Sequence, residues 1–320
     1  MSMLRLAFFT LSLIVSGAAL AQGFPSRPVR IVVPFPGGVA DTLARMMAPK
    51  MSEALGQPVV VENKPGGSGQ IGAVEVIRAP ADGHTIFLGH IGTHAVNPHL
   101  FTKLNYDPEK DFSPITLLIT VPNLLVVHPS VPAASVRELV AYAKSRPGAL
   151  SYASPGSGSS GHLAAELFKS MAGVDIVHVP YKGAAPALQD LMGGQVQVLF
   201  DTLAQALPQA KIGKVRALAV TTLKRQPVAP DIPTMDEQGF PGWETGPWFG
   251  FFVRAGTPEP VAGRLHLEAV RALNAAEVRD RLAALGANVV GNTSAEFAAF
   301  IHAERARWGK VVRAAGIRAD

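Results

Sequence analysis

The first third of the chain alternates short β-branched, apolar runs with longer segments whose apolar residues recur every three or four positions. The strand-like runs are VRIVVPF, PVVVEN and HTIFLG. Helix-like segments cover Asp41 to Leu55 and Gly69 to Ala79, and a loop is expected through Asn97-Pro98. This alternation predicts an α/β layer with a largely parallel sheet.

A second alternating series begins after Asp111. Its strand-like runs are ITLLITVPNLLVVHP, SYAS, IVHVPYK, VQVLFD and VRALAVT. Helices are predicted from the capping box Ser135-Val136-Arg137-Glu138, over Ser159 to Ala172 and over Ala184 to Met192. The series predicts a second sheet, again rich in parallel strands.

The C-terminal part begins with the extended stretch WETGPWFGFFVR and continues with helices from Pro258 to Leu285 and from Thr293 to Ala315. This helical tail is expected to have no sheet of its own, so it most simply packs on the first domain. The chain then crosses between two domains near Val121–Val127 and again near Pro247–Val253. Two α/β domains joined by two crossovers leave a cleft with a hinge, which suits ligand capture.

The N-terminus has the pattern of a secretory signal peptide. Arg5 precedes an apolar run of roughly ten residues, and Ala19-Leu20-Ala21 forms a cleavage motif before Gln22. A buried N-terminal helix is the alternative, but the charge, apolar run and Ala-x-Ala occur in the order of a signal peptide. We therefore expect export and cleavage after Ala21, with domains at 22–122 plus 248–320 and at 123–247.

Composition excludes several classes of function. The chain has no cysteine, which removes disulfides, thiolate catalysis and cysteine-based metal sites. The formal net charge is +5, but the basic residues are scattered and do not alternate with aromatic residues in one stripe. A nucleic-acid partner is therefore not expected.

Nucleotide-binding motifs find little support. Gly213-Lys214 and Gly309-Lys310 are both followed by valine, so the phosphate-binding P-loop is absent. Two windows fit G-x-G-x-x-G, at 67–72 and 156–161, but neither has an acidic residue at the distance that ribose binding requires. No cofactor is expected.

Two catalytic or metal sites are weighed as alternatives. A secreted serine hydrolase would use Ser159 or Ser160 with His162, although both serines lie one residue out of frame for a nucleophile elbow. His90, His94 and His99 are weighed as metal ligands, but Gly92, Pro98 and the lack of an HExxH helix leave no preformed coordination face, so they are better explained as loop histidines and no metal is expected.

Two glycine- and serine-rich turns remain, each at the start of a predicted helix. Gly37-Gly38 and Ser157–Ser160 place small residues and free backbone N–H groups where the partial positive charge of a helix favours an anion. Alternatively the glycines only make tight turns and a serine only caps its helix. Asp41 and Asp201 have the same two interpretations: each contacts a ligand, or each only stabilises its own helix start.

Over nearly its whole length after the signal peptide, the sequence resembles the solute-binding receptors of tripartite tricarboxylate transporters, also called the Bug family. The segments that carry the resemblance occur in this order: PSRPVRIVVPF with PGGVAD, LGQPVVVENKPGGSGQIG, ADGHTIFLG, THAVNPHLF, YDPEKDFSPI, SPGSGSSGHLAAELF, HVPYKG, KVRALAVT, IPTMDEQGFPGWE and RAGTPEPV. The loop before the glycine pair is one residue shorter here than is usual in the family.

Membership implies a two-domain periplasmic binding protein of the type 2-like, Venus flytrap class, with two interdomain crossover strands. Such a receptor is a monomer that closes over a small carboxylate, either a mono-, di- or tricarboxylate or a carboxylated aromatic or amino acid. It delivers this solute to the membrane permease subunits and performs no chemistry. A carboxylate sensor with a membrane signalling partner would share the same site.

The resemblance also implies which residues hold the ligand. The first loop supplies a carboxylate cradle, the second loop faces it from the other domain, and three further residues match other cleft positions. These residues are Pro36, Gly37, Gly38 and Asp41 in the first loop, Ser154, Gly156, Ser157, Gly158, Ser159 and His162 in the second, and Thr93, His94 and Asp201 elsewhere.

Overall fold

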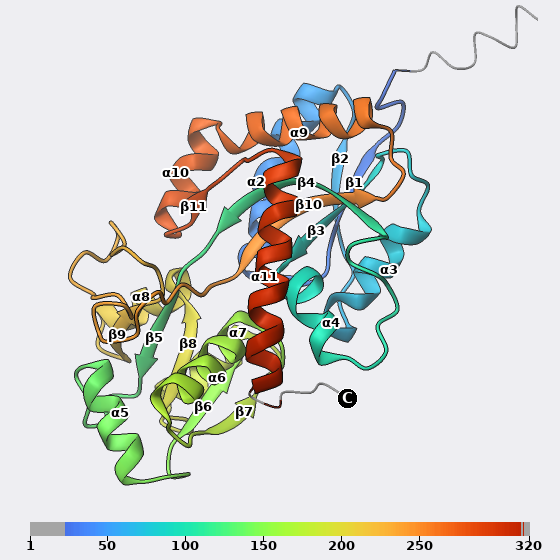
Figure 1. Cartoon of the computed structure of the whole chain (residues 1–320). Helices are drawn as coiled ribbons and strands as arrows, with labels where there is room; N and C mark the ends of the chain where they lie inside the picture. The colour runs from blue at the N-terminus through green and yellow to red at the C-terminus, as the bar shows by residue number, and fades with distance from the viewer. Residues whose placement is uncertain (1–22, 315, 317–320) are drawn as a thin grey trace, which may run out of the picture.

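The computed structural model describes residues 23–314 and 316, and every structural statement below concerns these residues. The predicted signal peptide and its cleavage site lie outside the described residues. The described chain forms two α/β lobes, each built around one sheet (Figure 1). No helix within the described range has the length and apolar character that crossing a membrane requires.

The first lobe contains a six-stranded sheet in the order β11-β4-β10-β3-β1-β2. β1 is parallel to β2 and β3, whereas β10 is antiparallel to β3 and β4, and β11 is antiparallel to β4. The strands are β1 (Val29–Val33), β2 (Val59–Asn63), β3 (Thr85–His90), β4 (Phe112–Thr120), β10 (Trp248–Arg254) and β11 (Asn288–Val289).

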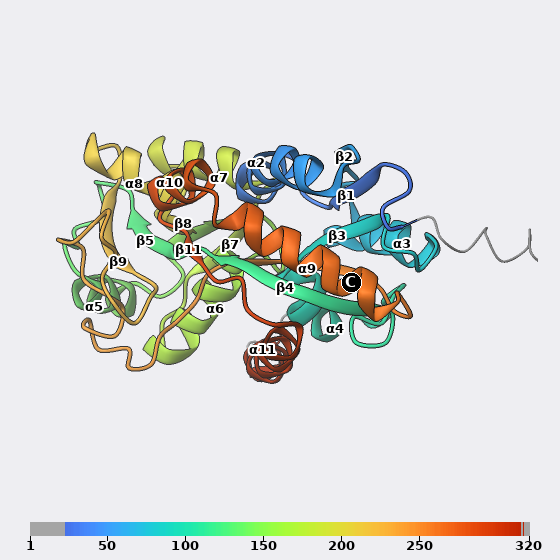
Figure 2. The ribbon, with the colours of Figure 1, turned by 90° about the horizontal axis from the view of Figure 1, so that it is seen from above.

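Successive strand residues point to opposite faces of the sheet, and those on both faces are mostly apolar. Helices therefore cover both faces. α2 (Gly38–Leu55) and α9 (Glu259–Leu273) bury one face, and Leu43, Met47 and Met51 of α2 belong to that core. The other helical segments of the lobe are η2 (Gly67–Gly69), α3 (Gln70–Arg78), η3 (Gly92–Val96), α4 (Asn97–Leu100), α10 (Ala276–Ala284) and α11 (Ser294–Ala314). Figure 2 shows α2 and α11 on opposite sides of the sheet.

The second lobe contains a five-stranded sheet in the order β7-β6-β8-β5-β9. Its core packs α5 and α6 on one face and α7 and α8 on the other. The elements are β5 (Asn123–Val127), α5 (Val136–Ser145), β6 (Ser151–Ser154), α6 (Ser160–Ala172), β7 (Val177–Pro180), α7 (Ala184–Met192), β8 (Val198–Thr202), α8 (Leu203–Lys211) and β9 (Arg216–Val220).

Three expectations from the sequence need correction. Both sheets are mixed, because β10 and β11 run antiparallel to their neighbours in the first sheet and β5 runs antiparallel to both β8 and β9 in the second. The loop expected at Asn97-Pro98 is helical: η3 leads directly into α4, where Pro98 occupies the first turn and its fixed φ favours a helix start. The C-terminal tail does contribute a strand, since β11 pairs with β4.

The two crossover segments lie side by side. The backbone N–H of Val121 donates to the carbonyl of Pro247 at 2.8 Å, and the next residue, Trp248, pairs with Thr120. A Cβ added at Gly246 would overlap the carbonyl oxygen of Val121. Only glycine therefore permits this separation between the two segments.

α11 ties the second crossover to the first lobe and reaches α6 of the second lobe (Figure 1). The buried carboxylate of Glu304 accepts hydrogen bonds from the indole N–H groups of Trp248, at 3.0 Å, and Trp308, at 2.9 Å. Arg307 also donates to the carbonyl of Glu244. A small cavity of about 120 Å³ remains between these side chains and the crossovers.

Replacement of Gly246 by alanine is expected to destabilise the protein by roughly 1–3 kcal/mol, because the added methyl group forces two hydrogen-bonded backbone segments apart. The matched control is Gly263→Ala in α9, where an added Cβ meets nothing within 4 Å and stability should rise by about 0.5–1 kcal/mol. Chemical denaturation of both variants measures the difference. Equal stability of the two variants would contradict the close packing of the crossovers.

Candidate functional site

Parallel strands of both sheets end close to the two crossover segments. In the first lobe, β3 ends at His90, which pairs with Phe249 at the start of β10. In the second lobe, β8 ends at Thr202, which pairs with Asn123 at the start of β5. Ligands of α/β proteins bind beyond the carboxyl ends of parallel strands. The gap between the lobes is therefore the candidate site.

The first predicted loop follows β1. Gly37 and Gly38 both have positive φ, 69° and 67°, and both are exposed, so α2 begins without a side-chain cap. Pro36 is exposed beside them. The N–H groups of the first turn of α2 consequently point out of the helix without a capping side chain.

Asp41 stabilises this loop through several contacts. Its carboxylate accepts hydrogen bonds from Arg45 at 3.0 Å and from Asn63 at 2.8 Å. Arg45 also donates to the side-chain amide oxygen of Asn63. Burial alone would raise the pKa of Asp41, but the hydrogen bonds from Arg45, Asn63 and the Gly37 amide outweigh it and lower that pKa. The contacts of Asp41 support the interpretation in which it shapes the loop.

Thr93 and His94 lie at the start of η3, fully buried behind that loop. The Thr93 hydroxyl donates to the carbonyl of His90 and lies 2.9 Å from Nδ1 of His94. The His94 ring stacks on Phe252 with centroids 3.7 Å apart, and only Gly89 between them permits this approach. His90 in turn packs edge-on against Phe35 of the first loop at 4.5 Å.

These histidines are neutral hydrogen-bonding groups. Burial lowers the pKa of His90 to about 3, and burial together with His90 and Arg305 lowers the pKa of His94 well below its usual value. The Nε2 atoms of His90 and His94 and the side-chain oxygen of Gln70 are buried without a protein partner. Unpaired buried polar atoms are costly, so these three atoms favour a partner with hydrogen-bonding groups.

The second predicted loop follows β6 and leads into α6. Ser159 is the N-cap of that helix and accepts a hydrogen bond from the backbone N–H of His162 at 3.3 Å. Nδ1 of His162 accepts from the N–H of Gly158 at 3.1 Å. Ser157 is exposed at the tip of the loop, while Ser154 at its base is fully buried.

This loop reaches the first lobe. A Cβ added at Gly158 would lie 2.6 Å from Leu100 of α4 and 4.0 Å from Val96 of η3. Leu163 of α6 belongs to the same apolar cluster as these two residues. The segment that carries Thr93 and His94 is therefore in contact with the predicted loop of the other lobe.

Asp201 is buried near the end of β8. One carboxylate oxygen accepts from the N–H of Thr202, and the other has no protein partner. Burial raises the pKa of Asp201 to about 7. The side-chain amide of Asn123 and the hydroxyl oxygen of Thr202 are also buried without a partner in the described chain. Both residues face the opposite side of the sheet from Asp201, because successive strand residues alternate.

The geometry around Ser159 and Ser160 does not resemble a hydrolase centre. Ser159 uses its hydroxyl to cap α6, and the His162 ring bonds a backbone amide. A serine–histidine pair of hydrogen-bonding length does occur, Ser154 to His178 at 2.7 Å, but Ser154 is fully buried and also accepts from the Gly156 amide. A buried hydroxyl of this kind supports the loop and is not presented to a substrate.

The described part of the chain contains no group of three or more histidine, cysteine, aspartate or glutamate side chains arranged to hold a metal ion. Each of the three histidines considered for such a site has another partner. His90 accepts from the Gly92 amide, His94 is paired with Thr93, and His99 bonds the carbonyl of Arg305.

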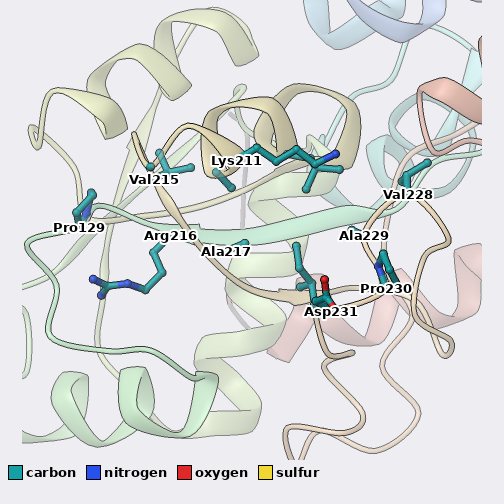
Figure 3. A pocket seen from close by; sticks show the side chains of 13 residues that line it. Pro129, Lys211, Val215, Arg216, Ala217, Val228, Ala229, Pro230 and Asp231 are labelled. Carbon is teal, nitrogen blue, oxygen red and sulfur yellow. The ribbon is translucent and has the colours of Figure 1, made fainter.

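A separate hollow of about 630 Å³ lies on the second lobe beside β9 and α8. Figure 3 shows its lining, which includes Lys211, Arg216 and Asp231. Arg216 pairs with Val127, at the end of β5 that is farther from the crossover. It contains none of the predicted site residues, and Arg216 donates to the carbonyls of Val131 and Ala133.

Sequence reasoning did not single out Gln70, Asn123, His178 or Thr202. Asn123 stands at the start of the apolar run NLLVV, and His178 interrupts the apolar run IVHVP. A polar residue inside a predicted strand was the available signal. No local motif indicates which of these side chains lacks a partner, because that depends on the packing of the two lobes.

Comparison with known proteins identifies the relatives of this chain. Residues 43–317 match the family described as the tripartite tricarboxylate transporter family receptor. Protein BugT of Bordetella pertussis is 35% identical over 306 residues, which cover 95% of this chain and 94% of BugT.

Solved structures agree with this match. An R. palustris protein with adipate superposes with a TM-score of 0.86 and 42% identity, over 92% of this chain and 99% of that one. MatC from Rhodopseudomonas palustris with bound malate gives a TM-score of 0.82 and 40% identity, over 90% of this chain and all of MatC. The periplasmic binding protein BugD is also similar, with a TM-score of 0.82 and 38% identity, over 92% of this chain and 99% of BugD. The fold is the two-domain Venus flytrap of periplasmic binding proteins.

Substitution of Asp201 by asparagine is expected to stabilise the ligand-free protein at pH 8 by roughly 1–3 kcal/mol, because it removes an unpaired buried charge. The folded pKa of about 7 exceeds the ordinary value of 3.8, so the contribution of Asp201 is full below pH 3.8 and is lost as the pH rises through about 7. The gain should thus shrink as the pH falls from 8 to 5. Denaturation at several pH values measures it, with the exposed Asp231→Asn as control.

Proposed function

Because the chain belongs to the tripartite tricarboxylate transporter family of receptors, we propose that it captures a small carboxylate in the cleft between its lobes and releases it unchanged. The class comprises mono-, di- and tricarboxylates and carboxylated aromatic or amino acids. The observation that carries the proposal is the contact of the Gly158 loop with η3 and α4, at the level where both sheets end their parallel strands. Adipate and malate, named with two similar structures, belong to this class.

The carboxylate is held mainly by backbone N–H groups. Among the buried polar residues of the described chain, none is lysine or arginine. The starts of α2 and α6, preceded by Gly37 and Ser159, supply partial positive charge without a buried cation. Pro36, Gly38 and Asp41 shape the first loop, while Ser154, Gly156, Ser157 and Gly158 shape the second.

The rest of the ligand contacts buried polar side chains of both lobes, Thr93 and His94 in the first and Asp201 in the second. Nε2 of His94 and one carboxylate oxygen of Asp201 have no protein partner among the described residues and so are open to a bond with the ligand. Because the pKa of Asp201 is about 7, its carboxyl group donates to a ligand oxygen when protonated and accepts from an amine or hydroxyl when ionised. Selectivity among carboxylates therefore depends on the group opposite this residue and on pH.

The same proposal assigns the protein to the periplasm, after removal of residues 1–21. Residues 22–122 and 248–320 form one domain and 123–247 the other, which rotate about the crossovers as a monomer. The receptor delivers its solute to the permease subunits of a tripartite transporter. Pull-down with detergent-solubilised permease separates this role from that of a sensor, which would bind a signalling partner through the same closed form.

Ligand binding is expected to compact the protein, because a carboxylate that contacts both lobes stabilises the closed form. Small-angle scattering and thermal shift across a panel of carboxylates measure this response, and mass spectrometry of co-purified ligand identifies the solute. A panel without any response would reject the proposal.

A matched pair of variants tests the interlobe contact. Gly158→Ala should weaken binding at least about tenfold and reduce the compaction, because its Cβ would collide with Leu100 only when the lobes meet. Gly173 also has a positive φ, so Gly173→Ala is strained in a similar way, but its added Cβ meets nothing within 4 Å. The affinity of this variant for the carboxylate should therefore equal that of the wild type. Equal affinity of both variants would contradict closure onto Gly158.

A further inference from the structure

Three rings stack beneath the loop from Ser154 to His162. The His162 ring of α6 lies 4.2 Å from the His178 ring of β7, at an interplanar angle of 17°. His178 stacks in turn on Tyr152 of β6, at 4.7 Å and 13°. The stack thus joins three elements of the second lobe directly under the loop that we assign to the ligand.

Both imidazoles are bonded to the base of that loop. Nδ1 of His162 accepts from the Gly158 amide at 3.1 Å. Nε2 of His178 lies 2.7 Å from the Ser154 hydroxyl, which itself accepts from the Gly156 amide at 3.2 Å. Gly156 and Gly158 have φ of 130° and 79°, so the stack holds the two residues at which the loop turns.

The two hydrogen bonds respond differently to a proton. Nδ1 of His162 accepts a hydrogen bond from an amide N–H, so this nitrogen must be unprotonated. In a protonated ring Nδ1 carries a hydrogen that faces the hydrogen of the amide, and the bond is lost. Ser154 has one hydrogen and accepts as well as donates, so its bond to His178 survives protonation by reversing direction. His162 is therefore the member of the pair that controls the loop.

We propose that His162 and His178 are positioning residues that hold the Gly156 and Gly158 amides, and that protonation of His162 releases the loop and its carboxylate. This inference rests on the proposed function. Neither residue needs to contact the ligand in order to perform this role.

The surroundings of the pair set the pH range. Burial and the neighbouring His178 lower the pKa of His162 to about 4, with a smaller lowering by Lys169 and an opposing effect of Glu166. Burial also lowers the pKa of His178. The Glu166 carboxylate is itself occupied by Tyr152 at 2.5 Å and Lys169 at 2.9 Å.

The direction of the pH effect on stability follows from the pKa of His162 in the unfolded and the folded chain. The unfolded chain binds the proton near the ordinary histidine pKa of 6.5, whereas the folded chain binds it near 4. The contribution of neutral His162 to the stability of the folded protein is therefore full above pH 6.5 and is lost as the pH falls toward 4.

Two substitutions of His162 separate the hydrogen bond from the packing. In His162→Asn, the amide oxygen takes the place of Nδ1 as acceptor and has no proton to gain. In His162→Phe, the ring still stacks but the acceptor is lost. We expect amide exchange of Gly158, followed by NMR, to stay slow in the wild type and His162→Asn and to quicken about tenfold or more in His162→Phe.

The same proteins are titrated with adipate by calorimetry. His162→Phe should bind about tenfold more weakly at pH 7.5, and His162→Asn within a few-fold of the wild type, as expected for one lost or retained hydrogen bond. Between pH 6.5 and 4.5, Gly158 exchange should quicken in the wild type, relative to the exchange of amides within α6, and stay constant on the same scale in His162→Asn. This pH series keeps the test valid if His162→Phe does not fold.

Slow Gly158 exchange in folded His162→Phe, or identical pH profiles of the wild type and His162→Asn, would overturn the proposal. Fast exchange with unchanged adipate affinity would overturn the link between the loop and the ligand. If the wild type binds no carboxylate, the receptor function fails by itself, and the exchange data still decide whether the histidines position the loop.

Discussion

The hydrogen bond between Val121 and Pro247 is the constraint on which the rest of the structure depends. It places the two crossover segments beside each other, with Gly246 allowing contact between their backbones. Parallel strands of both sheets consequently end near the crossovers, since His90 of β3 pairs with Phe249 and Thr202 of β8 pairs with Asn123. The proposed site, composed of residues far apart in the chain, depends on this alignment.

Within the described chain, the proposed cleft is polar without a buried lysine or arginine side chain. It uses the neutral histidines His90 and His94 in the first lobe and, in the second, the carboxyl group of Asp201, whose pKa burial raises to about 7. A buried lysine or arginine would hold an anion strongly but would carry a large desolvation cost when the lobes open and close. Backbone amides and neutral side chains suit a protein that must also release its ligand.

The sequence predicts the elements well where local signals agree. α7 occupies the predicted range, Ala184–Met192, because glycine precedes and follows an apolar helix pattern. β11 was missed because a two-residue strand has no periodicity, and its pairing depends on β4, which lies far away in the chain. The helical turn at η3 was missed because its residues are fixed by packing around Thr93 and Phe252 and not by helix propensity.

The same distinction holds for the site. Glycine pairs and helix starts are visible in the sequence because backbone geometry requires particular residues there. The support given by His178 to Ser154 is not visible, since the two residues meet only through the parallel pairing of β6 with β7. Local chemistry predicts the loops, and strand register decides which side chains hold them.

Two of the three tryptophans of this protein share the carboxylate of Glu304 at the point where the second crossover meets α11. Indole emission is sensitive to a nearby charge and to entry of water into the adjoining small cavity. The two indoles are therefore an intrinsic optical reporter beside the crossovers, and a rearrangement there would shift the emission colour of the unlabelled chain.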